Sequence, residues 1–119
     1  MRTEPDFARF ASLVFAVAIL VALLLGSPVP LPVGWDKAAH FAAFSLLTLF
    51  LWRATAGRMA PALLAGLVVF ALFDEWRQAY VPGRSSDATD FLADFCAVLA
   101  TGTLLFMQRK SVCAESSPP

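Results

Sequence analysis

Four long apolar stretches alternate with short polar or proline-containing segments along the chain. Each stretch has about 20 residues, the length of an α-helix that crosses a hydrocarbon core of roughly 30 Å. The predicted helices cover residues 7–25, 36–54, 61–80 and 87–107, and residues 108–119 are expected to form a disordered tail. The pattern therefore predicts an all-α membrane protein whose single domain, residues 1–107, is a bundle of four transmembrane helices.

Residues that begin or end helices set the boundaries of these stretches. Three prolines follow Gly26 and end the first helix. Gly57 predicts a tight turn between the second and third helices, and Pro61 stands at the start of the third, where proline is tolerated. Pro82 and Gly83 predict the turn that ends the third helix. The side chains expected to cap helix starts are Asp36 for the second helix and Ser85, Ser86 or Asp87 for the fourth.

The composition supports a membrane location and argues against other classes of protein. Hydrophobic residues make up 59% of the 119 residues and charged residues 15%, with a mean hydropathy of +0.70. A soluble chain of this length has no core large enough to bury so much apolar side chain. The net charge is zero, so no basic surface indicates nucleic-acid binding. Cys96 and Cys113 lack the spacing of metal or redox motifs, and we expect neither a disulfide, a metal site nor a cofactor.

The N-terminal stretch shares some features with a secretory signal peptide. Arg2 and Arg9 precede an apolar run of 16 residues, slightly longer than the usual core of such a peptide. No small-x-small cleavage site precedes Pro28. We therefore expect this stretch to remain as a membrane helix.

Basic residues are concentrated on one side of the predicted membrane. That side carries six cations against three acids, whereas the other carries three cations against six acids. The six cations are Arg2, Arg9, Arg53, Arg58, Arg109 and Lys110. The positive-inside rule then places both termini in the cytoplasm and the acid-rich side outward.

Three ionisable residues are expected at one depth in the membrane. Near the predicted cytoplasmic ends of their helices, Arg53, Pro61 and Met107 are each 13 residues, or about 20 Å of helix, from His40, Asp74 and Asp94 respectively. Further polar residues follow at helical spacings of three or four, so three helices carry a polar stripe over their outer halves. Charges at this depth cost about 2.5–3.5 kcal/mol each and should face the bundle interior or a water-filled cleft. The predicted polar cluster contains Asp36, Lys37, His40, Asp74, Glu75, Gln78, Arg84, Asp90 and Asp94.

A structural interpretation competes with a functional cleft. The same residues could form a polar network that locks the helices together. Asp36, Asp87 and Arg77 also fit the roles of helix caps or interfacial charges. The pattern leaves this choice open.

Three segments in order carry a resemblance to a known family. They read DKAAHFAAF at 36–44, DEWRQAYVPGRSS at 74–86 and DATDFLAD at 87–94. With this order and spacing the chain resembles the VanZ-like family of small bacterial membrane proteins over residues 35–102. The family pattern falls here on Asp36, Lys37, His40, Phe44, Glu75, Gln78, Arg84, Ser86 and Asp90. The chain departs from it at Asp94, where the family usually has asparagine, and near Ala97, where it usually has glycine.

The resemblance adds Ser86 to the candidate site and implies a multi-pass protein of the bacterial inner membrane. The family takes its name from a member linked to resistance to the glycopeptide teicoplanin, but the resemblance supplies no reaction. The oligomeric state also stays open.

Three functions fit these observations in descending order. The first is a non-enzymatic cell-envelope protein whose outward cleft binds a lipid headgroup, a cell-wall lipid intermediate or another membrane protein, with Arg84 holding a phosphate or carboxylate. The second is an enzyme acting on lipid-linked phosphate substrates, with Glu75 or His40 as general base and Arg84 stabilising an anion. The third is a small transporter subunit, which the apolar inner halves of the helices disfavour.

Overall fold

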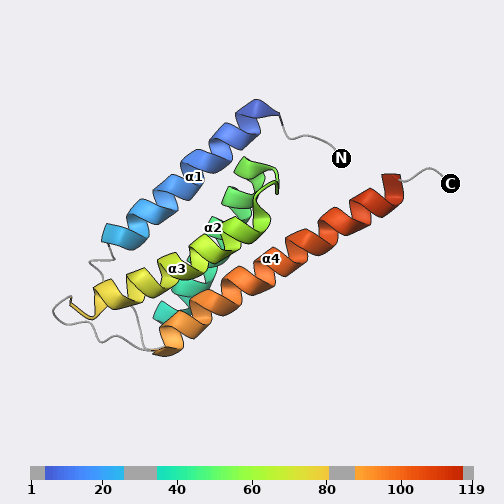
Figure 1. The fold of residues 1–119 in the computed structure, drawn as a ribbon. Coiled ribbons are helices and arrows are strands. Elements are labelled where there is room, and N and C mark those ends of the chain that lie inside the picture. The colour runs from blue at the N-terminus through green and yellow to red at the C-terminus, as the bar shows by residue number, and fades with distance from the viewer. Residues whose placement is uncertain (1–4, 26–34, 81–87, 117–119) are drawn as a thin grey trace.

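The computed structural model describes residues 5–25, 35–80 and 88–116, with the side chains of residues 36, 112, 113 and 116 left aside. These residues form four α-helices: α1 (Asp6–Leu25), α2 (Trp35–Thr55), α3 (Ala60–Gln78) and α4 (Ala88–Ser116) (Figure 1). The all-α class and the four predicted helices are confirmed. Their starts and the ends of the first three agree with the sequence-based boundaries within two residues.

The end of α4 differs from the prediction. Residues 108–119 were expected to be a disordered tail, but the helix continues to Ser116. Gln108, Arg109 and Lys110 are good helix formers, and no glycine or proline interrupts the chain before Pro118. The apolar part of α4 ends where polar residues begin, but the helix itself continues beyond that point.

Three of the four helices are long and apolar enough to cross a membrane. They are Asp6–Leu25, Lys37–Thr55 and Ala88–Ser111. α3 has a similar length, but Asp74, Glu75 and Arg77 lie within its last five residues and make it more polar. The polar end of α3 is thus the feature that separates it from the other three helices.

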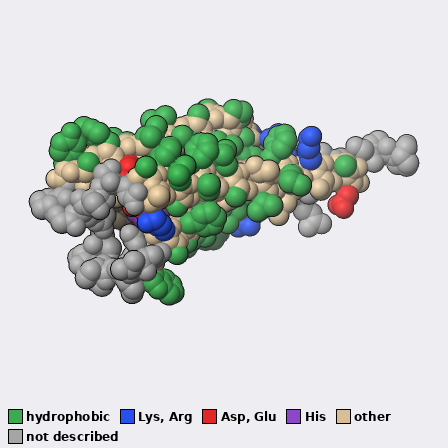
Figure 2. All heavy atoms as spheres, turned by 90° about the horizontal axis from the view of Figure 1, so that it is seen from below, with side chains coloured by type: hydrophobic (Ala, Val, Ile, Leu, Met, Phe, Trp, Pro, Cys, Tyr) green, Lys and Arg blue, Asp and Glu red, His purple; other side chains and the backbone are tan. Residues whose placement is uncertain are grey.

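The helices pack around α2 and α4. α2 contacts both α4 and α1, and α3 lies mainly against α4. Phe44, Leu47 and Val98 fill the centre, with Ala71 and Ala97 allowing the helices to approach. Large apolar side chains elsewhere face outward, and Figure 2 shows them along the middle of the visible face. Such an apolar exterior suits contact with lipid.

Gly102 of α4 lies against the Leu64 side chain of α3. A Cβ atom on this residue would stand 2.9 Å from Leu64 Cδ2, whereas a Cβ on Gly66 would meet no atom within 4 Å. We expect Gly102→Leu to lower the free energy of unfolding by about 1–3 kcal/mol, because the added side chain forces α3 and α4 apart. The matched control Gly66→Leu should be neutral or stabilising, because leucine favours the helix over glycine. Thermal unfolding of both variants in detergent tests this, and equal melting temperatures would refute the proposed close packing.

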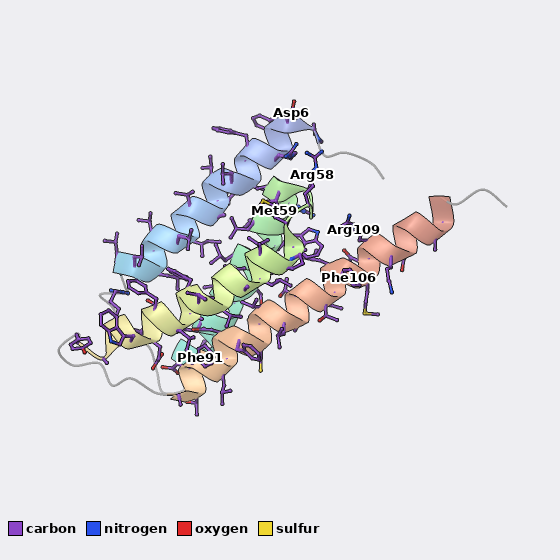
Figure 3. The ribbon with its side chains drawn as sticks, in the orientation of Figure 1. Asp6, Arg58, Met59, Phe91, Phe106 and Arg109 are labelled. Carbon is purple, nitrogen blue, oxygen red and sulfur yellow. The ribbon has the colours of Figure 1, made fainter. Side chains whose placement is uncertain are left out.

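Basic side chains gather at the end of the bundle that holds the α2–α3 turn. Arg9 of α1 donates to the carbonyl of Ala54 at 3.3 Å, and Arg109 of α4 donates to the carbonyl of Gly57 at 3.0 Å. Gly57 has a φ of +70°, which glycine tolerates best. Figure 3 places Arg58 and Arg109 at this end and Phe91 toward the other. Arginines therefore hold the carboxyl end of α2, where helix carbonyls lack partners of their own.

Candidate functional site

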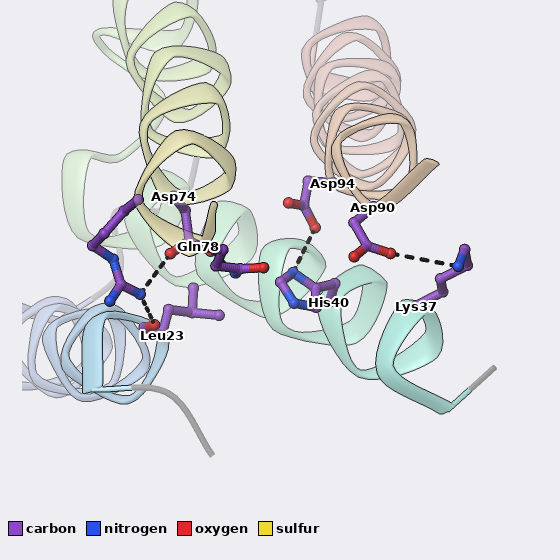
Figure 4. Close-up of polar contacts among 8 residues, drawn as sticks. Leu23, Lys37, His40, Asp74, Gln78, Asp90 and Asp94 are labelled. Carbon is purple, nitrogen blue, oxygen red and sulfur yellow. Dashed lines mark hydrogen bonds and ion pairs between the residues drawn. The ribbon is translucent and has the colours of Figure 1, made fainter. Parts of the chain in front are cut away.

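Polar side chains from α2, α3 and α4 meet at the opposite end of the bundle. We call this set the polar layer, and it comprises Lys37, His40, Asp74, Arg77, Gln78, Asp90 and Asp94 (Figure 4). Its members lie on the last two turns of α3 and the first two turns of α2 and α4. The three helices thereby bring together residues that are far apart in the sequence.

His40 and Asp94 link α2 to α4 in the middle of the polar layer. His40 Nδ1 lies 3.2 Å from Asp94 Oδ1, and the Asp94 side chain is only 1% exposed. This contact places the two residues at the same level along the bundle. The Asp94 carboxylate accepts a hydrogen bond from His40 Nδ1–H, and this bond fixes the orientation of the imidazole ring.

Asp74 of α3 is equally buried and accepts two hydrogen bonds within its helix. Arg77 Nη2 donates to Oδ1 at 2.9 Å, and Gln78 Nε2 donates to Oδ2 at 3.0 Å. Both donors come from the next turn of the helix, at spacings of three and four residues. The carboxylate is therefore satisfied on both oxygens.

Arg77 also joins α3 to α1. Its Nη2 donates to the carbonyl oxygen of Leu23 at 3.0 Å, in the last turn of α1. A cation at this position satisfies an end carbonyl and complements the helix dipole. α1 therefore contributes a backbone group to the site, although it carries no charge there.

Lys37 and Asp90 form a contact between α2 and α4 about one turn nearer the end of the bundle than His40 and Asp94. Lys37 Nζ lies 3.6 Å from Asp90 Oδ1, which is an ion pair longer than a hydrogen bond. The Lys37 side chain is 45% exposed and the Asp90 side chain 10%. A buried carboxylate here faces a cation whose side chain is nearly half exposed.

The hydrogen bonds within α3 lie close to the contacts between α2 and α4. In Figure 4 the Asp74 and Gln78 side chains lie beside the His40–Asp94 pair, on the inner side of the helices. Asp74 is near enough for its charge to act on both His40 and Asp94. The polar layer thus concentrates three buried aspartates, and a favourable charge balance depends on the cations around them.

The predicted cluster is partly reproduced. Lys37, His40, Asp74, Gln78, Asp90 and Asp94 come together in the polar layer, and Glu75 lies half-buried next to Asp74. Arg84, Ser86 and the side chain of Asp36 lie outside the described residues. Within the described part of the chain, no three His, Cys, Asp or Glu side chains could hold a metal ion.

Arg77 is the site residue that sequence reasoning missed. Its position at the end of a helix suggested a cap or an interfacial charge. The i,i+3 spacing from Asp74 was the signal for their ion pair. Its second partner is a backbone carbonyl of another helix. Every residue has such a carbonyl, so the sequence does not indicate which one accepts this bond.

Comparison with known families identifies a match over nearly the whole chain. The sequence profile of the VanZ/LLP1 family matches residues 4–109, nearly the whole chain. The chain belongs to the VanZ/LLP1 family. The match extends over α1 as well as the polar helices, so the family includes the element whose carbonyl holds Arg77. Together with three apolar helices of membrane-spanning length, it makes this VanZ/LLP1 chain a membrane protein.

No curated protein and no solved structure matches the chain.

Proposed function

We propose that this VanZ-like protein is a non-enzymatic cell-envelope protein of the bacterial inner membrane whose polar layer faces outward and binds a polar lipid headgroup. The headgroup belongs to a membrane phospholipid or to a lipid-linked cell-wall intermediate. An outward site would also suit the family's link with teicoplanin resistance, because glycopeptides act outside the cell membrane. The charge distribution and the hydrogen bonding of the buried groups support this proposal.

The distribution of charge supports a four-span topology with both termini in the cytoplasm. The end with the α2–α3 turn carries Arg9, Arg53, Arg58, Arg109 and Lys110, whereas the polar layer with its buried aspartates lies at the other end. Cations favour the cytoplasmic side. The exposed aromatic residues Trp76 and Tyr80 stand at the end of α3, with ring centroids 5.2 Å apart, as expected at an interface. In this topology α3 crosses the membrane with its polar end at the outer surface.

Cysteine accessibility in intact cells tests this topology. In a background with Cys96 and Cys113 replaced by alanine, Tyr80→Cys should react with a membrane-impermeant maleimide. Arg58→Cys, on the α2–α3 turn, should react only after the cells are permeabilised. Reaction of both positions from outside would contradict the proposal that α3 crosses the membrane.

One observation favours a ligand-binding site over a polar network that only holds the helices together. Arg77 Nε and Asp90 Oδ1 are buried atoms without a hydrogen-bond partner in the described part of the chain. Buried polar atoms are nearly always satisfied in a finished network, and an unsatisfied one costs about 1–3 kcal/mol. Arg77 Nε is a hydrogen-bond donor and Asp90 Oδ1 is an acceptor. A zwitterionic or hydroxyl-bearing headgroup offers an acceptor to the first and a donor to the second.

Lipid retention tests the headgroup proposal with a matched pair of arginine variants. Arg77→Gln should reduce the lipid that stays bound during native mass spectrometry by about tenfold, because a charge-assisted hydrogen bond is lost. Arg109→Gln, which breaks a bond of the same length to a carbonyl at the other end, should retain wild-type lipid. Equal retention by both variants would contradict a headgroup site in the polar layer. Capture of a protein instead of a lipid would favour the partner-protein alternative.

The His40–Asp94 contact supports a second candidate, an enzyme acting on lipid-linked phosphates at the membrane surface. A carboxylate that holds Nδ1 leaves the other ring nitrogen of His40 to act as a general base. In this function Glu75 is an alternative base and Arg84 would stabilise the anion. Turnover of lipid-linked phosphates that is lost in His40→Gln or Glu75→Gln would favour the enzyme, and the absence of turnover in the wild type would exclude it for those substrates.

A further inference from the structure

Asp90 differs from the other two buried aspartates of the polar layer. Asp74 accepts hydrogen bonds at 2.9 and 3.0 Å, and Asp94 lies 3.2 Å from His40. Asp90 is also buried, with 7% of its surface exposed, but its Oδ1 accepts no hydrogen bond from the described residues. Among the described residues, this oxygen forms a 3.6 Å ion pair with Lys37 Nζ. Oδ1 therefore has a cation 3.6 Å away but no hydrogen-bond donor at bonding distance among the described residues.

We propose that Asp90 binds the protonated primary amine of the ligand, and that Lys37 occupies this position loosely when the ligand is absent. This inference rests on the proposed function and names the chemical class of its headgroup. An ammonium group brings both the charge and the N–H donor that Oδ1 lacks. Charge-assisted hydrogen bonds of this kind are about twice as strong as neutral ones.

The position of Asp90 suits entry of a ligand from the membrane surface. Asp90 lies four residues before Asp94, so it stands on the same face of α4 and one turn nearer the end of the bundle. Lys37 stands one turn nearer the end of α2 than His40. The Lys37–Asp90 pair thus lies nearer the end of the bundle than the His40–Asp94 pair, and the nearly half-exposed lysine reaches solvent.

The chemistry of Oδ1 distinguishes a primary amine from a quaternary one. A choline headgroup carries the same positive charge as ethanolamine but has no N–H to donate. Beside choline, Asp90 Oδ1 would stay buried without a hydrogen bond, and this loss would weaken binding. The acid-rich end, with six acids and three cations in the sequence, also favours a cationic group over a purely anionic one.

Lipid competition in nanodiscs tests the inference. Wild-type protein in nanodiscs of equal phosphatidylethanolamine and phosphatidylcholine should retain the ethanolamine lipid about tenfold over the choline lipid on ejection into a mass spectrometer. Asp90→Asn should reduce this preference to less than about twofold, because it loses the charge that attracts ammonium. Asp6→Asn, an exposed aspartate at the other end, should keep the full preference. Lys37→Gln should raise the preference above wild type, because it removes the competing ammonium.

Each outcome bears on one of the two proposals. Retention of both lipids without preference, or an unchanged preference in Asp90→Asn, would overturn the amine assignment while leaving headgroup binding intact. A lowered preference in Lys37→Gln would also overturn it, which keeps the test decisive if Asp90→Asn does not fold. No lipid retained by the wild type would instead refute the proposed function. Free ethanolamine added to choline-only nanodiscs separates the two sources of the amine: protection from thermal unfolding would show that a soluble amine is enough, and its absence that the lipid is required.

Discussion

Replacing His40 with leucine is expected to lower the free energy of unfolding by about 3–5 kcal/mol. The substitution leaves the Asp94 carboxylate, 1% exposed, without its hydrogen-bond donor. Removing one member of a buried charged pair is more costly than replacing both, because the remaining group is neither solvated nor paired. Chemical or thermal unfolding of the purified protein in detergent measures the effect.

The double variant His40→Leu/Asp94→Leu is the control for this prediction. It should recover much of the lost stability, because two apolar side chains of similar volume can replace a buried polar pair at little cost. Thr48→Val serves as a second control, because the Thr48 hydroxyl is buried but donates only to the Phe44 carbonyl of its own helix. A double variant whose loss equals the sum of the two single losses would show that His40 and Asp94 do not interact.

Asp74→Ala should be the next most damaging change, with a loss of about 2–4 kcal/mol. Arg77 and Gln78 both lose their acceptor, and the Arg77 guanidinium is left partly buried. Because the Arg77 side chain is 27% exposed, water should compensate part of the cost, and the loss should be smaller than for His40→Leu. Amide hydrogen exchange should also rise in the last turn of α1, because Asp74 holds the arginine that bonds to Leu23.

Asp74→Asn separates the charge of this residue from its hydrogen bonding. The asparagine oxygen can still accept from one donor, so we expect a loss of roughly half that of alanine. Unchanged exchange at the end of α1 in Asp74→Ala would show that Arg77 does not depend on Asp74 for its position. Exchange that rises equally along all of α1 would indicate general unfolding rather than a local loss.

The hydrophobic pattern was sufficient to predict the four helices and the level along the bundle at which His40 and Asp94 meet. Apolar stretches of one length, punctuated by Gly57 and Pro61, determine four helices with few alternatives. α2 and α4 run in the same direction, so equal counts from their basic ends bring His40 and Asp94 to one level along the bundle. The packing of α2 against α4 then brings the two side chains to 3.2 Å.

Other features of the site could not be predicted from residue spacing. Spacing along a helix shows which residues share a face, but not which neighbouring helix that face meets. The bond from Arg77 to the Leu23 carbonyl depends on how α1 and α3 lie in space. The end of α4 was missed for another reason: polarity marks where a helix leaves the membrane, whereas only glycine, proline or a competing cap ends the helix itself.

Photocrosslinking with a phospholipid that carries a diazirine in its headgroup tests the central claim most directly. Headgroup binding in the polar layer predicts labelled peptides from residues 35–41, 74–80 and 88–95, with labelling reduced in Arg77→Gln but not in Arg109→Gln. A probe with the diazirine in its acyl chain should instead label the exposed apolar face of α1. Headgroup labelling confined to the α2–α3 turn and the end of α4 would contradict an outward lipid site in the polar layer.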